Sequence, residues 1–242
     1  MRVYIQKDFT GEFLNVNCFT AYAGFSLMGW EVIGFEKLPP EGLHREDIVV
    51  GYISSVKTAL INLGITPPEE LDYPEELNEF YGRKLWKSQL SIIANSPEMY
   101  PVFIKPVLGK QFDGRLVKSF KDLIACGSNS EDREIWCSEP VNFIAEYRCF
   151  IKYGIVVDAR LYKGDWSKVI NADVVKHCVE KFTKQPASYT LDFGVTDDGR
   201  TLLVEANLGF SLGAYGLQPL DYAKNISACW AEMTDTIDHC RF

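Results

Sequence analysis

The chain has 242 residues and a formal net charge of −8, and 47% of its residues are hydrophobic. This length predicts one large domain or two small ones, and the apolar content excludes a disordered chain. The acidic balance argues against bulk nucleic-acid binding, and no apolar run approaches the roughly 20 residues of a membrane span. Seven cysteines without a CxxC pair, and an N-terminus unlike a signal sequence, predict a cytoplasmic protein in a reducing compartment.

The N-terminal part alternates short β-like runs with apolar helical runs. Strands are predicted over residues 2–6, 30–36 and 47–53, and helices over 16–30 and 54–65. Ser54 or Ser55 is placed to cap the second helix, and Gly64 to end it. This βαβ-like order predicts a small parallel sheet. The proline- and acid-rich segment 66–77 follows and is the predicted linker.

Beyond this segment the pattern is dominated by strands. Helices are predicted over 82–93, 119–126, 170–182 and 219–233, and strands over 100–107, 134–141, 145–154 and 155–164. A glycine-bearing loop that leads into a strand is predicted within 108–117. A β-hairpin begins near Tyr189, and its Asp-Asp-Gly turn is a strong short-range hairpin signal.

Three oxygen-bearing side chains lie on the two predicted strands of this hairpin. Glu205 and Asn207 are two residues apart and so point to the same face, and the hairpin can bring Asp192 onto the neighbouring strand of that face. Such hard oxygen ligands suit Mg²⁺. A solvated carboxylate face is the alternative, but the flanking residues are apolar, so a charge at Glu205 needs a partner.

Lys105 lies in an apolar strand before a loop that contains Gly109 and Gly114. Glycines let backbone N–H groups approach phosphate oxygens, and a lysine adds positive charge beside them. The spacing is not that of a P-loop, and a strand lysine with its amine at the surface is the alternative. Taken alone, the segment leaves both interpretations open.

In their order along the chain, these segments resemble the ATP-grasp superfamily. The stretch FIKPVLGKQFDG resembles its strand lysine and glycine loop, and WCSEPVNFIAEYRCFI resembles its hinge strand and arginine-bearing strand. The stretch LDFGVTDDGRTLLVEANLGFSLGAYG resembles its metal-binding hairpin. The likeness is strongest from Arg83 to Gly216, and the short length resembles a divergent branch proposed to modify proteins or peptides.

The resemblance implies an α/β (α+β) ATP-grasp fold with a small N-terminal α/β pre-ATP-grasp domain. The implied boundaries place this first domain at 1–75 and the ATP-grasp domain at 76–242. The ATP-grasp domain would then divide into a small subdomain, 76–138, and a large subdomain, 139–242.

The resemblance also implies nucleotide contacts. Contacts to ATP are implied for Lys105, for one of Lys84 and Lys87, and for the loop from Gly109 to Gly114 with Lys110. Contacts to adenine through backbone groups are implied for Glu139 and Val141, and a contact to the ribose for Glu146.

The remaining implied roles concern the reaction. Arg148 would reach the phosphoryl group being transferred, and Arg160 and Lys163 are candidate acceptor or phosphate contacts. The implied ligands of Mg²⁺, with Mn²⁺ as the alternative ion, are Asp192, Glu205 and Asn207. In the glycine-rich loop that follows, Ser211 is a candidate hydrogen-bond donor to the substrate.

Such a fold implies an ATP-dependent carboxylate–amine or carboxylate–thiol ligase that works through an acyl phosphate and releases ADP. Its substrates would be a small-molecule or peptide carboxylate and an amine, with a protein as a further candidate substrate. Two alternatives stay open: a phosphotransferase on the same scaffold, and an ATP-binding interaction module without turnover. The carboxylate, the acceptor and the oligomeric state are not specified by the sequence.

Overall fold

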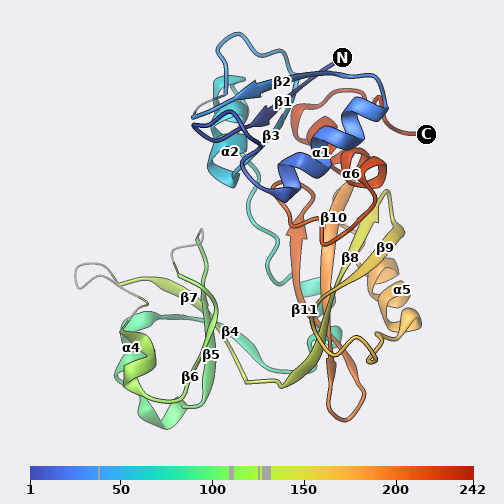
Figure 1. The fold of residues 1–242 in the computed structure, drawn as a ribbon. Helices are drawn as coiled ribbons and strands as arrows, with labels where there is room; N and C mark the ends of the chain where they lie inside the picture. Colours follow the sequence, from blue (N-terminus) through green and yellow to red (C-terminus); the bar gives the residue numbers. More distant parts are fainter. Residues whose placement is uncertain (38, 109–111, 125, 127–131) are drawn as a thin grey trace. The chain divides into compact units, whose positions relative to one another are not determined.

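The computed structural model describes residues 1–37, 39–108, 112–124, 126 and 132–242, and the chain forms two compact units. The larger unit combines Met1–Phe80 with Ile144–Phe242, and the smaller unit is Tyr81–Phe143, drawn mainly in green in Figure 1. The domain boundaries expected from the sequence stay predictions.

The larger unit begins with a three-stranded parallel sheet in the order β2-β1-β3. In this sheet β1 (Arg2–Gln6) lies between β2 (Glu31–Phe35) and β3 (Ile48–Val50) and pairs in parallel with both. Helix α1 (Val16–Leu27) lies between β1 and β2 in the chain, and α2 (Ile53–Asn62) follows β3. The predicted βαβ-like order and parallel sheet are confirmed.

The predicted serine cap of α2 is wrong. The N-cap residue is Tyr52, which makes no side-chain cap bond, and α2 begins at Ile53. Ser55 instead lies inside the helix, where its hydroxyl donates to Oε1 of Gln6 at 2.9 Å. The Ser55 hydroxyl, which the sequence pattern assigned to the helix cap, therefore bonds Gln6 on β1 instead. Gly64 does follow the helix end, with a φ of +73° that suits glycine.

The N-terminal sheet shares one hydrophobic core with the end of the chain. Helix α6 (Pro219–Thr234) lies beside α1 in Figure 1, and Gly24 permits their close approach, because a Cβ there would lie 2.0 Å from the carbonyl oxygen of Pro219. Trp230 is buried in this core, and its indole nitrogen donates to the carbonyl of Arg45 at 2.8 Å. Residues from both ends of the chain thus complete each other's burial.

The segment predicted to be a linker is packed. Tyr73 and Leu77 are buried, and the carbonyl of Asp72 accepts a hydrogen bond from the N–H of Ala206 at 2.9 Å. A short 3₁₀ turn, η1 (Glu75–Leu77), leads into α3 (Asn78–Tyr81). The proline and acidic residues of segment 66–77 therefore belong to turns and exposed positions, while the segment itself is anchored.

The second sheet of the larger unit has four strands in the order β11-β10-β8-β9. Its members are β8 (Phe143–Lys152), β9 (Ile155–Gly164), β10 (Ser188–Thr196) and β11 (Thr201–Leu208), with α5 (Ala172–Lys181) between β9 and β10. The pairs β8/β9 and β10/β11 are antiparallel, which confirms the predicted hairpin.

The smaller unit is built on an antiparallel sheet in the order β4-β7-β5-β6. Its strands are β4 (Leu85–Gln89), β5 (Val102–Pro106), β6 (Arg115–Val117) and β7 (Glu134–Ser138). Its short helical turns are α4 (Leu90–Ala94), η2 (Pro97–Met99) and η3 (Phe120–Leu123). A separate core, with Ile104, Val117 and Ile135 among its buried residues, fills one side of this sheet.

The helix predicted over 82–93 is largely wrong. Residues Leu85–Gln89 form strand β4, and only Leu90–Ala94 are helical. The spacing of Leu85, Gln89 and Ile92 fits a helical period, but strand pairing with the whole of β7 satisfies the backbone of 85–89. Long-range pairing therefore overrides the local pattern here.

All seven cysteines are buried free thiols. Burial raises the pKa of these thiols, for example that of Cys178 to about 12, so they are expected to be unreactive. Among the described residues, none of the helices combines the length and the apolar character that crossing a membrane requires.

Candidate functional site

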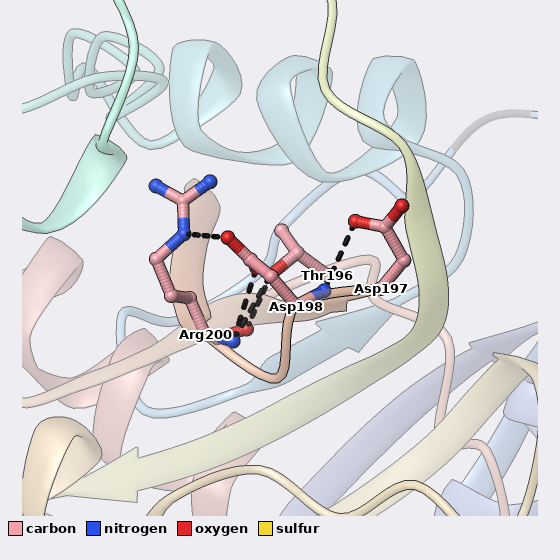
Figure 2. A network of polar contacts seen from close by, with 4 residues as sticks. All are labelled: Thr196, Asp197, Asp198 and Arg200. Carbon is pink, nitrogen blue, oxygen red and sulfur yellow. Dashed lines mark hydrogen bonds and ion pairs between the residues drawn. The ribbon is translucent and has the colours of Figure 1, made fainter.

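The turn of the β10/β11 hairpin is held by its own side chains (Figure 2). Nε of Arg200 donates to Asp198 at 2.8 Å, the N–H of Asp198 donates to Asp197 at 3.0 Å, and the hydroxyl of Thr196 bonds Asp198. Gly199 supplies the left-handed residue that the turn requires, with φ +84°. A turn fixed in this way sets the register of the two strands behind it.

That register places Asp192 directly opposite Glu205, and Thr190 directly opposite Asn207. Opposed residues of an antiparallel pair point to the same face, so these four side chains share one face of the hairpin. The amide nitrogen of Asn207 donates to Glu205 at 3.2 Å. The predicted triad of Asp192, Glu205 and Asn207 is therefore brought together; its role stays a prediction.

Arg148 on β8 reaches Asp192 on β10 through a bidentate ion pair. Its Nε donates to Oδ1 at 2.8 Å and its Nη2 to Oδ2 at 2.7 Å, and the two side chains are only 9% and 3% exposed. Burial raises the pKa of Asp192, as do the carboxylates of Glu205 and Glu146, while Arg148 opposes that rise. Burial acts to lower the pKa of Arg148, but the bonds and charge of Asp192 outweigh it and the pKa is raised.

We call the surface formed by Arg148, Thr190, Asp192, Glu205 and Asn207 the hairpin face. Its oxygen donors are of the kind that Mg²⁺ accepts, two carboxylates and an amide. The hydroxyl of Thr190 is buried and has no hydrogen-bond partner among the described residues. A buried hydroxyl without a partner fits a surface that completes its hydrogen bonds when a polar ligand arrives.

The oxygen atoms of the hairpin face suit a metal ion that is bound partly by the protein and partly by other ligands. Among the described residues, no group of three or more His, Cys, Asp and Glu side chains is arranged to hold a metal ion. The hairpin face offers two carboxylates, and one of them already has an arginine partner. The residues thus fit an ion such as Mg²⁺ that takes its remaining ligands from water and phosphate.

Two tyrosines cover Arg148. Tyr215 lies with its ring centroid 5.0 Å from the guanidinium carbon and stacks on Tyr162, with centroids 4.9 Å apart and an interplanar angle of 19°. The ring of Tyr162 is 6.0 Å from the same carbon. The aromatic faces attract the guanidinium and shield it from water.

The glycine-rich loop 209–217 presents Tyr215 in a fixed conformation. Ser211 and Tyr215 both have left-handed backbones, with φ +54° and +46°. A Cβ on Gly213 would lie 2.9 Å from the Tyr215 ring, so glycine is needed beneath it. The loop is anchored by the N–H of Ala214, which donates to Asn17 at 2.9 Å, and by the hydroxyl of Tyr222, which donates to the Leu212 carbonyl at 2.6 Å.

The Ser211 hydroxyl, expected to donate to the substrate, donates to the Gly51 carbonyl at 2.9 Å in this structure. It therefore serves as a further anchor of the loop. Glu146, expected at the ribose, accepts from the Tyr162 hydroxyl at 3.0 Å and pairs with Lys163 at 2.5 Å. Burial and the nearby carboxylates of Asp192 and Glu146 raise the pKa of Tyr162, which keeps its phenol protonated.

Arg160 lies on β9 directly across from Arg148 on β8. Its Nη2 pairs with Asp158 at 2.5 Å, whereas its Nε is buried and has no partner among the described residues. The two arginines thus share a face but have different carboxylate partners. The unpartnered Nε is consistent with a residue that receives an anion.

In the smaller unit, two of the predicted lysines flank one tryptophan. Lys87 on β4 and Lys105 on β5 are both directly opposite Trp136 on β7, so the three side chains lie on one face, which we call the lysine face. The Lys87 amine lies 5.0 Å from the Trp136 ring centroid. Lys84, just before β4, instead lies over Trp86, whose side chain packs against the core of this unit.

The smaller unit also contains other residues predicted to contact the nucleotide. The N–H of Glu139 already donates to the Lys84 carbonyl at 3.1 Å, and the Glu139 carboxylate accepts from the Lys84 N–H at 2.9 Å. Val141 lies between β7 and β8 and is half-buried. A Cβ on Gly114 would meet the Phe103 ring at 2.7 Å, so this glycine serves packing. Gly109 and Lys110 lie outside the described residues.

Sequence reasoning missed Tyr162, Tyr215 and Thr190. Tyr162 lies two residues after the predicted Arg160, and Thr190 lies two residues before Asp192, so period-two spacing along a strand was an available signal for both. Tyr215 lies in a loop without any periodicity. Only the left-handed backbone and the anchors of that loop bring its ring over Arg148.

Comparison with solved structures supports the class of fold. D-cycloserine synthetase DcsG superposes with a TM-score of 0.58 at 11% identity, covering 96% of this chain and 100% of the other. D-alanine–D-alanine ligase from Bacillus anthracis complexed with ATP gives 0.56 at 14%, covering 97% of both chains. ATP-grasp ligase PsnB complexed with precursor peptide PsnA2 and AMPPNP gives 0.52 at 13%, covering 96% and 97%. The chain has the ATP-grasp fold.

The family follows from the sequence itself. Residues 80–225 match the family described as ATP-grasp domain, R2K clade family 2. Because this match spans more than half of the chain, the protein belongs to that family. A search of curated proteins finds no match.

Proposed function

We propose that this protein is an ATP-dependent carboxylate–amine ligase that acts through an acyl phosphate on an amino acid, peptide or protein. The observation that carries the proposal is the hairpin face, where a buried arginine meets two carboxylates and an amide on one side of a sheet. Family membership and the ATP-grasp fold support it. The solved structures complexed with ATP or with a precursor peptide support the substrate classes by analogy.

In the proposed first step, an oxygen of the substrate carboxylate attacks the γ-phosphorus of ATP. The bond from that phosphorus to the ADP oxygen breaks, which gives an acyl phosphate and ADP. Arg148, which the ion pair with Asp192 positions on this face before the nucleotide binds, donates to the phosphoryl oxygens. Bound Mg²⁺ supplies charge neutralisation, with Asp192, Glu205 and Asn207 as its proposed protein ligands.

In the proposed second step, an amine attacks the acyl carbon, the carbon–oxygen bond to phosphate breaks, and the amine loses a proton. Arg160 and Lys163 are the proposed contacts to the acceptor or to phosphate. On the smaller unit, taken by itself, Lys105 is the proposed ATP contact. We favour Lys87 over Lys84 as the second lysine, because Lys87 shares the lysine face with Lys105.

The experiment incubates the protein with ATP, Mg²⁺, a pool of carboxylates and hydroxylamine, and resolves nucleotides and hydroxamates by mass. We expect ADP and a hydroxamate, and we expect Glu205→Gln to suppress both. AMP with pyrophosphate would contradict the acyl-phosphate route, and a phosphorylated hydroxyl compound without hydroxamate would favour a phosphotransferase. ATP binding without turnover of any carboxylate would favour an interaction module.

Calorimetry of Mg²⁺–ATP binding tests the assignments separately from turnover. We expect Lys105→Ala and Glu205→Gln each to weaken binding by about 1–3 kcal/mol, the scale of a lost charged hydrogen bond. Affinities equal to wild type in both variants would remove these residues from the site.

A further inference from the structure

The Arg148–Asp192 pair occupies the carboxylate that the proposed function needs for a metal ion. A carboxylate offers about four lone-pair positions, and both oxygens of Asp192 accept from Arg148. The guanidinium also leaves a positive charge beside those oxygens, which repels a divalent cation. Asp192 is therefore a poor ligand for a free cation while this pair is intact.

Arg148 is held in that position from a second direction. Tyr215 lies over its guanidinium, and Tyr162 stacks on Tyr215. The loop that carries Tyr215 is anchored to Asn17 and Gly51. The guanidinium is thus held on Asp192 by the aromatic cover of an anchored loop as well as by the ion pair itself.

The remaining negative charge near the hairpin face is also engaged by the protein. Glu146 pairs with Lys163 and accepts from Tyr162. Glu205 accepts from the amide of Asn207. Without an added anion, each of these carboxylates thus already accepts from a protein donor. A nucleotide triphosphate brings several negative charges and gives Arg148 a second anion to bind.

We propose that the pairing with Arg148 keeps Asp192 from binding a divalent cation, so that the cation is taken up only together with the nucleotide. We call this role of Arg148 the guard. This inference rests on the proposed function, because it assumes that Asp192 is a metal ligand. Phosphate oxygens draw the guanidinium away from full pairing with Asp192, and the carboxylate then becomes available. Since binding free energies are coupled reciprocally, the nucleotide also binds poorly without the cation.

The test measures Mn²⁺ binding by electron paramagnetic resonance, with and without a non-hydrolysable ATP analogue. The proteins are wild type, Arg148→Gln and Arg160→Gln, and the last is a matched control for free Mn²⁺ only, because Arg160 is itself a proposed phosphate contact. Arg160 lies directly across from Arg148 and pairs with Asp158, so this control removes the same charge from the same face without touching Asp192.

We expect wild type to bind Mn²⁺ weakly alone and tightly with the analogue. Arg148→Gln should bind free Mn²⁺ at least about tenfold more tightly than wild type, and Arg160→Gln should differ from wild type by less than about threefold. Equal free-Mn²⁺ affinity in wild type and Arg148→Gln, with nucleotide-dependent binding retained, would overturn the guard and leave the proposed function standing. No Mn²⁺ binding by any protein, with or without the analogue, would overturn both.

A second measurement follows wild type, with Arg148→Lys used only for assignment, in case Arg148→Gln does not fold. The Nε–H signal of Arg148 in an arginine-selective NMR spectrum, assigned by its loss in Arg148→Lys, reports directly on the bond to Asp192. Mg²⁺ alone should leave this signal unchanged, and Mg²⁺ with the analogue should shift it. A full shift with Mg²⁺ alone would contradict the guard.

Discussion

The hairpin face of the larger unit and the lysine face of the smaller unit present charge in opposite ways. On the hairpin face, Arg148 and Asp192 are buried and bound to each other. On the lysine face, Lys87 is exposed and rests against an aromatic ring. The first arrangement is fixed before any ligand arrives, whereas an exposed lysine adjusts to its ligand. Breaking the buried pair should therefore lower folding stability, whereas substitutions on the lysine face should change ligand affinity alone.

The largest effect is expected from breaking the buried ion pair. Arg148→Met and Asp192→Leu should each lower the free energy of unfolding by about 3–5 kcal/mol, because each leaves a buried charge without its partner. The double variant should recover most of that loss, since neither charge remains. Urea unfolding followed by circular dichroism measures all three. Losses that simply add in the double variant would show that the two residues are not coupled.

A smaller change at the same face should separate catalysis from binding. Arg148→Lys keeps the charge but loses the planar fork of donors. We expect turnover to fall by about 10²–10³-fold, the scale of a lost transition-state donor, with ATP affinity nearly unchanged. Rates from ADP release and affinities from calorimetry are compared on folded protein. A wild-type rate in this variant would remove Arg148 from the reaction.

The lysine face should respond in affinity alone. Lys87→Ala is expected to weaken Mg²⁺–ATP binding by about 1–2 kcal/mol, while the free energy of unfolding changes by less than about 0.5 kcal/mol. Lys84→Ala is the matched control, because it removes the same charge three residues away and on the side of Trp86. An equal loss in both variants would mean that the affinity depends on the overall positive charge and not on the position of Lys87 on the lysine face.

The smallest expected effect concerns the aromatic cover of Arg148. Tyr215→Ala should lower the free energy of unfolding by about 0.5–1.5 kcal/mol, the scale of a lost stack and cation–π contact. Tyr215→Phe keeps the ring and should stay within about 0.5 kcal/mol of wild type. Thermal unfolding compares the two. If Tyr215→Phe were as destabilised as Tyr215→Ala, the hydroxyl rather than the ring would be responsible.

The sequence predicted the elements whose signals are local. The Asp-Asp-Gly turn fixed the hairpin, and the spacing of Glu205 and Asn207 placed both on one face. It did not predict the pairing of Arg148 with Asp192, which lie 44 residues apart and meet only when the strands assemble into a sheet. Nor did it predict strand β4, where pairing with β7 overrides a helical period. Long-range strand order is the part that local patterns do not contain.

The two ends of the smaller unit have a consequence for how the chain is assembled. The guanidinium of Arg83 lies 5.8 Å from the rings of both Tyr81 and Phe143, so the first and last residues of this unit are close together. Residues 81–143 are thus an insertion with adjoining ends, of the kind that can be excised and expressed alone. The larger unit is interrupted, and Trp230 and other residues of α6 complete the core of residues 1–80. During synthesis the inserted unit can fold as soon as it emerges. The sheet of β1, β2 and β3, by contrast, can complete its core only after α6 has been made.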